Sequence, residues 1–328
     1  YAKYWRPNMK PMQKQVVDAL LRGTEARELA FNLDNAGELL KSGYLPLESG
    51  YTRLANGQTF IAVYTEMPGV TGPMFEWWMG WHYMEHQRYK LWHPRAHVAN
   101  GTSEMQGDNP DITDKQKYMT THYVTEYIGN RLERITISFS DPKEYFGESA
   151  DLTAGNTSAL VCGRVDLQRA PITLGYLIHQ IREINGGTEM RSRFWLGKPE
   201  ISDSKRHDLR NWVLGSKFFR RLVLPGDIGA AMLVHCGMEM NHLAGFLPLA
   251  IHRLMAEPAR LGDHQNLFRR CLHRSVQQHQ PAQGGHREKT ECLFHMISIH
   301  LNCADAPQFN WELTDGQAIS LVKQTCIS

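Results

Sequence analysis

Alternating hydrophobic and polar positions predict a series of β-strands in the middle of the chain. Residues 58–65 (QTFIAVYT) indicate one strand, and the β-rich runs YVTEYI and LERITISF meet around Gly129-Asn130, as in a β-hairpin. Because successive side chains of a strand point to opposite faces, each run can bury one face against a core. Further strands are expected at residues 157–165, 174–182 and 188–196.

Helical periodicity near the N-terminus predicts two short helices. Residues 12–22 (MQKQVVDALLR) have the apolar spacing of an amphipathic helix that ends at Gly23. A second helix is expected to begin at Asp34, a suitable N-cap, and to end at Gly43. We therefore expect a small, mainly helical N-terminal domain over residues 1–70.

Two later segments have the composition of buried helices. Residues 73–92 are aromatic on most sides and lie between two prolines, which predicts a helix buried on more than one face. From about residue 226 a long apolar run predicts a further helix, which Pro248 kinks or ends. Strands in the middle and a long helix near the end favour an α+β fold, in which an antiparallel sheet wraps around that helix.

The predicted elements divide the chain into three parts. The N-terminal domain is followed by a second domain over residues 71–258, which holds the sheet and the long helix. Residues 259–328 are rich in His, Gln and Arg and show no sustained period, so we expect an atypical, poorly ordered tail. A metal-binding segment in this tail is disfavoured, because its His and Cys residues have no recognisable ligand spacing.

Composition argues against several classes of partner. The chain has 328 residues, 42% of them hydrophobic and 21% charged, with a formal net charge of +2. This balance gives no electrostatic reason to bind nucleic acid or an anionic membrane, and no uncharged apolar run of about 18 residues indicates a membrane span. Six cysteines without C-x-x-C spacing are expected to be reduced thiols of a cytoplasmic protein. A homodimer is left open.

The segment VHCGMEMNHLAGFLP carries the first indication of chemistry. His235 and Glu239 lie four residues apart in an otherwise apolar run, so a helix places both on one face. An imidazole and a carboxylate on a buried face form half of a four-coordinate metal site. Taken alone, the pair can equally be a hydrogen-bonded contact in a helix-packing seam.

Two further segments supply groups that complete such a set. Glu126 shares a strand face with Val124 and Ile128, where a carboxylate is costly to bury unless a positive group meets it. His93 and His97 follow the aromatic helix. Two histidines and two carboxylates suit zinc, which in catalytic sites keeps one position open for water or substrate.

Several long motifs resemble the 2,4-diacetylphloroglucinol hydrolase family, which includes phloretin hydrolases. They are WWMGWH, RYKLWHPRAH, TEYIG, EMRSRFWLG and HCGMEMNHLAGFLP, and the likeness extends from about residue 1 to residue 255. It implies a Zn²⁺-dependent hydrolase that cleaves the carbon–carbon bond between a phloroglucinol-type ring and an acyl group, releasing a carboxylic acid such as acetate. It also implies a helix-grip domain, similar to START and pollen-allergen domains, preceded by a small helical domain.

The same resemblance assigns the metal ligands. They fall on His97, Glu126, His235 and Glu239. His93 is a rival to His97, although Pro94 interrupts any helix that the two would share. Glu133 is a rival to Glu126, since it has inward parity, but it lies beside the hairpin turn where water reaches it easily. His242 is expected to pack near the site rather than to bind the metal.

Substrate contacts are implied in the same way. The residues that hold phenolic oxygens fall on Tyr89 and Asn100, and a further polar residue of the substrate site falls on His179. The strand pattern independently predicts that His179 points inward with Leu177. Phe194 stands where the diacetylphloroglucinol enzyme has a tyrosine, so one hydrogen bond to the substrate is lost.

The expected reaction is hydrolysis of an acylated phenol. Protonation of the electron-rich ring carbon turns the ring into a stabilised leaving group, and His179 or Tyr89 is expected to deliver that proton. Two alternatives stay open: a non-catalytic helix-grip protein that binds hydrophobic phenolic ligands, and a zinc hydrolase of esters or amides. Convergence of the four ligands on one point distinguishes a metalloenzyme from the simple binder.

Overall fold

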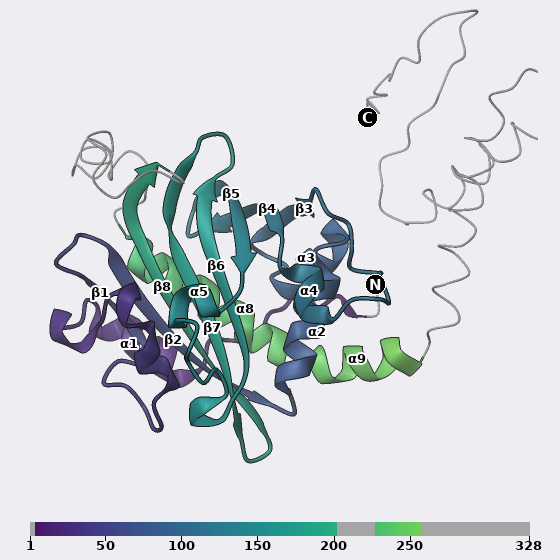
Figure 1. Ribbon diagram of the computed structural model, residues 1–328, viewed down its shortest axis with the longest axis horizontal. Helices are drawn as coiled ribbons and strands as arrows, with labels where there is room; N and C mark the ends of the chain where they lie inside the picture. Colours follow the sequence, from purple (N-terminus) through teal and green to yellow (C-terminus); the bar gives the residue numbers. More distant parts are fainter. Residues whose placement is uncertain (1–3, 202–226, 257–328) are drawn as a thin grey trace, which may run out of the picture. The chain divides into compact units, whose positions relative to one another are not determined.

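The computed structural model describes residues 4–201 and 227–256, and these residues belong to one compact unit (Figure 1). The predicted tail over residues 259–328 lies outside the described residues. The helices are α1 (Lys14–Arg22), η2 (Arg27–Leu29), η3 (Leu33–Leu40), α2 (Gly72–His82), α3 (His86–Trp92), α4 (Asp114–Tyr118), α5 (Lys143–Phe146), η4 (Ala154–Asn156), α8 (Ile228–Ala244) and α9 (Leu247–Ala256). The strands are β1 (Gly50–Arg53), β2 (Thr59–Pro68), β3 (His97–Thr102), β4 (Thr121–Ile128), β5 (Arg131–Ser140), β6 (Thr157–Leu167), β7 (Ile172–Ile184) and β8 (Gly187–Ile201).

The described strands form one antiparallel sheet in the order β1-β2-β8-β7-β6-β5-β4-β3. Figure 1 shows α8 crossing one face of this sheet. We call that side the inner face and the opposite side the outer face. The α+β prediction is confirmed, and an antiparallel sheet that wraps a long helix is the helix-grip arrangement.

Each face of the sheet has a hydrophobic core of its own. On the inner face, β-strand residues such as Val63 and Ile181 pack in one cluster with Leu233 and Met240 of α8. On the outer face, Trp195 belongs to a second cluster that includes residues of η3 and the loop after it. The central strands are therefore buried on both sides, and alternation of polarity in them does not mean exposure to water.

The segment predicted as a separate N-terminal domain is distributed over the whole unit. Its helix α1 packs on α8, where a Cβ on Gly237 would approach the Val16 side chain to within 2.7 Å. Its strands β1 and β2 extend the sheet, with Thr59 paired to Leu196 of β8. Its helix η3 covers the outer face. Residues 4–70 thus contribute to both cores.

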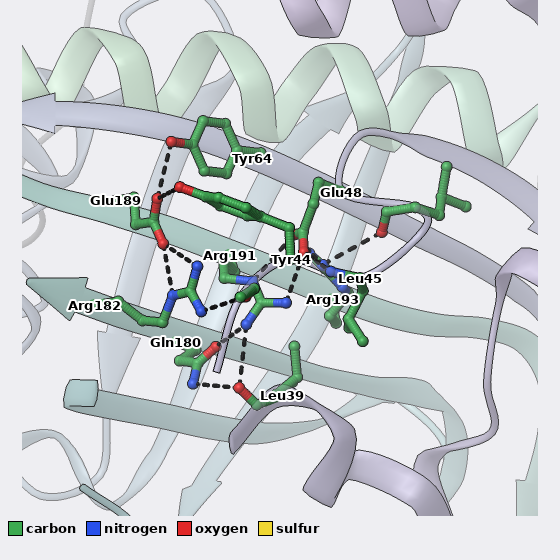
Figure 2. A network of polar contacts seen from close by, with 12 residues as sticks. Leu39, Tyr44, Leu45, Glu48, Tyr64, Gln180, Arg182, Glu189, Arg191 and Arg193 are labelled. Atoms are coloured by element: carbon green, nitrogen blue, oxygen red, sulfur yellow. Dashed lines mark hydrogen bonds and ion pairs between the residues drawn. The ribbon is translucent and has the colours of Figure 1, made fainter. Parts of the chain in front are cut away.

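Buried charges hold this segment against the outer face (Figure 2). Glu48 accepts hydrogen bonds from Arg191, at 2.6 and 3.0 Å, and from Arg193 at 2.5 Å. Glu189 pairs with Arg182 and accepts further hydrogen bonds from two tyrosine hydroxyl groups. Although burial raises the pKa of Glu48, the charges of the two guanidinium groups hold it below its ordinary value.

Three helix predictions require correction. The segment that begins at Asp34 is the 3₁₀ helix η3, which has Asn32 as N-cap and non-helical backbone angles at Asn35; Asn and Gly are weak helix formers, which explains the break. Residues 73–92 form two helices, α2 and α3, and Arg88 donates a hydrogen bond to the Trp81 carbonyl near the end of the first.

Pro248 neither kinks nor ends α8. That helix ends at Ala244, and Pro248 is the second residue of α9. A proline is tolerated there because the N–H groups of a first helical turn have no partner within the helix.

Candidate metal centre

Three elements bring four polar side chains together on the inner face. β3 and β4 pair so that His97 lies directly opposite Glu126. α8 contributes His235 and Glu239, which its i,i+4 spacing places on one side. All four side chains are buried, with exposed fractions of 3 to 7%. The four positions predicted for metal ligands therefore meet in one buried cluster.

The distances suit a single cation. His97, His235 and Glu239 each offer a ligand atom, and these atoms lie within 4.8 Å of one another. The Nε2 atom of His97 is 3.5 Å from Glu239 Oε1 and 3.5 Å from Glu126 Oε2. The Nε2 atom of His235 is 3.8 Å from a carboxylate oxygen of each glutamate. The buried histidine and glutamate side chains could thus hold a metal ion.

Hydrogen bonds to the backbone orient both imidazoles. The Nδ1 atom of His97 lies 2.9 Å from the Tyr89 carbonyl, and Nδ1 of His235 lies 3.1 Å from the Tyr127 carbonyl. A carbonyl only accepts, so each Nδ1 carries the proton and each Nε2 keeps its lone pair. Among the described residues, Nε2 of His97 has no hydrogen-bond partner. A buried nitrogen left with a free lone pair is what a metal ligand requires.

Burial moves the pKa values of the four groups toward their neutral forms. It raises the pKa of Glu126 to about 7, against the opposing effect of a Tyr89 hydrogen bond. It raises the pKa of Glu239 well above its ordinary value, assisted by the charge of Glu126. It lowers the pKa of His235 to about 4 and that of His97 well below its ordinary value. Two carboxylates beside two neutral imidazoles form an unfavourable arrangement that a bound cation reverses.

Tyr89 connects the cluster to α3. Its hydroxyl donates to Glu126 Oε2 over 2.5 Å, and its ring stacks on His97 with centroids 3.7 Å apart. The pKa of Tyr89 is raised well above its ordinary value by burial and by the Glu126 charge. This side chain, predicted as a contact for phenolic oxygens, therefore also orients two of the metal-ligand candidates.

A β-bulge brings Asn100 to the same face as His97. The register of β3 shifts between His97 and Ala99, so that Asn100 lies opposite the inward-facing Val124. The Asn100 amide donates to the His82 carbonyl over 3.2 Å. Without the shift, two residues three positions apart would face opposite sides of the strand.

The other predicted substrate residues lie on β7 and β8. His179 and Phe194 are buried on the inner face, with ring centroids 5.7 Å apart in an edge-to-face arrangement. Phe75 of α2 also packs against His179, with ring centroids 6.3 Å apart. Sequence reasoning missed Ser192, which lies 2.7 Å from His179 Nδ1. Ser192 and Phe194 lie two residues apart in the predicted strand, so strand alternation could have placed both on the same face.

The rival ligands flank the cluster. The His93 ring stacks on His235, with centroids 4.9 Å apart, and its Nδ1 has no hydrogen-bond partner among the described residues. Glu133 lies opposite Glu126 in the β4–β5 register and forms an ion pair with Arg131 at 3.3 Å. In the described residues, the group of ligand atoms that fits one cation consists of His97, His235 and Glu239, so it includes neither rival. Glu126 also lies outside this group, although its Oε2 is 3.5 Å from Nε2 of His97.

Fold and site together define a class: a helix-grip domain whose core contains a buried histidine–glutamate cluster able to bind a metal. Comparison with protein families matches residues 30–252 to the DAPG hydrolase PhiG domain. The chain belongs to the 2,4-diacetylphloroglucinol hydrolase family, and it is a hydrolase. The family resemblance seen in the sequence is thereby confirmed.

Curated relatives agree with this assignment. The chain is similar to a 2,4-diacetylphloroglucinol hydrolase of Pseudomonas sp, with 31% identity over 79% of this chain and 89% of the relative. A protein of the same name from Pseudomonas protegens has 31% identity over 79% of this chain and 85% of its own. The phloretin hydrolase of Eubacterium ramulus has 27% identity over 76% of this chain and 88% of its own.

Among solved structures, that of Ara h 8.0201 is similar with a TM-score of 0.32 and 10% identity, covering 58% of this chain and 98% of the other. Within residues 4–201 and 227–256, no helix is long and apolar enough to cross a membrane.

Proposed function

We propose that the chain is a zinc-dependent hydrolase that cleaves the carbon–carbon bond between a phloroglucinol-type ring and its acyl group. The observation that carries the proposal is the buried convergence of two neutral imidazoles and two carboxylates, in a chain of this family. A protein that only encloses a phenolic ligand has no need to bury two like charges together, because their mutual repulsion costs stability.

The donor set fits zinc. His97 and His235 would bind through Nε2, and Glu126 and Glu239 through carboxylate oxygens. Two nitrogen and two oxygen donors at this spacing are typical of zinc in proteins. When bound, zinc supplies Lewis acidity and lowers the pKa of a water molecule toward neutrality.

The remaining polar residues are assigned to the phenolic ring. Tyr89 and Asn100 lie on the side of β3 that carries His97, and His179 lies among aromatic side chains on β7. Hydrogen bonds from such groups orient the ring oxygens, and Phe75 and Phe194 exclude water from the ring.

Hydrolysis adds a hydroxyl group to the acyl carbon and a proton to the ring carbon. Tyr89 and His179 are the residues proposed to deliver that proton. Their surroundings differ, because the Tyr89 hydroxyl is engaged by Glu126 whereas burial lowers the pKa of His179 to about 4. Tyr89→Phe and His179→Gln distinguish them: the variant of the proton-delivering group loses turnover while its zinc content is unchanged.

The substrate assignment is tested by incubating the purified protein with diacetylphloroglucinol, with phloretin and with a simple aryl ester. Chromatography then follows the released carboxylic acid and the deacylated phenol. We expect acid and phenol in equal amounts from at least one of the two ketones, and slow turnover of the ester. A zinc-loaded protein that acts on neither ketone would contradict the substrate class, and rapid turnover of the ester alone would identify an esterase.

A further inference from the structure

His179 has one hydrogen-bond contact among the described residues, and it is to Ser192. The two side chains lie directly opposite each other in the β7–β8 register, and Ser192 Oγ is 2.7 Å from Nδ1 of the imidazole. His179 is only 6% exposed, and Ser192 is fully buried. The remaining ring nitrogen, Nε2, is therefore the one available to a substrate.

Ser192 also contacts α8. Its hydroxyl lies near the thiol of Cys236, a buried free cysteine that directly follows His235 in the chain. The Ser192 side chain thus lies between the imidazole on β7 and the helix that carries two of the proposed metal ligands. Ser192 lies in neither the metal cluster nor the set of predicted substrate contacts.

The chemistry of the neighbouring groups gives the Ser192–His179 hydrogen bond a direction. A hydroxyl has one proton to donate, and an unprotonated imidazole nitrogen is a far stronger acceptor than a thiol sulfur. The separation of 2.7 Å between Ser192 Oγ and Nδ1 of His179 suits a hydroxyl donor. Ser192 accordingly donates to Nδ1 of His179.

We propose that Ser192 is a positioning residue that holds neutral His179 in the tautomer with its proton on Nε2. His179 then presents an N–H donor to a phenolic oxygen of the substrate. Negative charge develops on that oxygen when the ring departs from the acyl carbon, and a fixed donor stabilises it. In this arrangement His179 does not accept a phenolic proton. The role of the tautomer rests on the proposed function.

A matched pair of variants on one strand tests the proposal. Ser192→Ala removes the hydroxyl that contacts His179. Thr188→Val is the control, because Thr188 is also buried on β8 and its hydroxyl has no partner among the described residues. We expect Ser192→Ala to lower kcat for the acylphenol by about 10- to 100-fold, as for other residues that orient a functional imidazole. Thr188→Val should retain the parent kcat, and both variants should retain the parent zinc content.

The second readout is the tautomer itself. ¹⁵N-labelled histidine in the zinc-loaded protein reports which ring nitrogen carries the proton, and the signals missing from His179→Gln identify His179. We expect Nε2–H in the parent and in Thr188→Val, and a mixture of tautomers in Ser192→Ala. A proton on Nδ1 in the parent, or an unchanged tautomer and kcat in Ser192→Ala, would overturn the proposal. The spectrum of the parent protein tests the tautomer even if the Ser192 variant does not fold or no substrate is cleaved. Failure of the proposed function is recognised separately, because it appears as missing zinc or missing cleavage.

Discussion

The two faces of the sheet both bury charged side chains, but they do so in opposite ways. On the outer face, three arginines meet two glutamates, and Glu48 alone accepts hydrogen bonds from both Arg191 and Arg193 (Figure 2). On the inner face, Glu126 and Glu239 meet two neutral imidazoles. Glu48 and Glu189 thus have cationic partners, whereas Glu126 and Glu239 have no arginine or lysine partner among the described residues.

This difference separates a structural network from a functional site. Paired charges such as Glu48 keep a lowered pKa and tie residues 4–70 to the sheet. Burial raises the pKa of both unpaired carboxylates, and the charge of Glu126 adds to the rise at Glu239. Their charged forms therefore destabilise the protein until a cation is bound. The inner face therefore favours binding of a cation at the expense of the stability of the metal-free protein. Variants of the two faces test this difference.

The largest effect is expected at the inner face, on activity. Glu239→Ala removes one of the proposed ligands, and we expect kcat/KM for the acylphenol to fall by about 10³-fold or more, equivalent to roughly 4 kcal/mol of transition-state stabilisation. Steady-state assays on zinc-supplemented protein measure it. Activity within a factor of ten of the parent would contradict a role for Glu239 in the reaction.

At the outer face the expected effect is on stability instead. Glu48→Gln leaves Arg191 and Arg193 buried without their counter-charge, which typically costs about 3 to 5 kcal/mol. Urea unfolding should show this loss, while kcat of the folded protein and its zinc content stay at the parent level. If Glu48→Gln unfolds at the parent urea concentration, the network does not hold the N-terminal segment.

In the metal-free protein, neutralising a carboxylate on the inner face should increase stability, which is the opposite of the effect expected on the outer face. Burial raises the pKa of Glu126 to about 7, so its charge destabilises the folded state increasingly as the pH rises from 4.5 through 7. Glu126→Gln is expected to stabilise the chelator-treated protein by about 1 to 3 kcal/mol at pH 8, and by less at pH 5. A destabilised apo variant at pH 8 would show that Glu126 has a cationic partner in the protein.

Buried histidines away from the cluster give the smallest predicted effect. Burial lowers the pKa of His122 to about 3 and that of His82 to about 4. The folded protein therefore binds these protons only at low pH, whereas the unfolded chain binds them near pH 6.5. The free energy of unfolding consequently decreases as the pH is lowered through this range. Unfolding free energies at pH 7.5, 6 and 5 should decline less steeply in His122→Gln than in the parent. Equal slopes would contradict a neutral, buried His122.

Local patterns were sufficient to predict most strands and part of the site. The hairpin around Gly129-Asn130 and the strand at residues 174–182 follow from alternation and turn chemistry. The pairing of His235 with Glu239 follows from helical spacing, and the inward position of Glu126 from strand parity. These features depend only on residues close together in the chain.

Local sequence patterns could not predict features that depend on contacts between residues far apart in the chain. Asn100 shares a face with His97 only because of a bulge set by pairing with β4. In β8, Arg191 and Arg193 alternate with Met190, Ser192 and Phe194 as in a half-exposed strand. Both arginines are nevertheless fully buried, because a segment some 145 residues earlier covers them.

The measurement closest to the central claim is the zinc content of purified protein, determined by elemental analysis for the parent, His235→Ala, Glu239→Ala and the outer-face control Glu48→Gln. The account predicts stoichiometric zinc in the parent and in Glu48→Gln, and its loss from both inner-face variants. A parent protein without stoichiometric metal, or full retention of zinc by both His235→Ala and Glu239→Ala, would contradict the account.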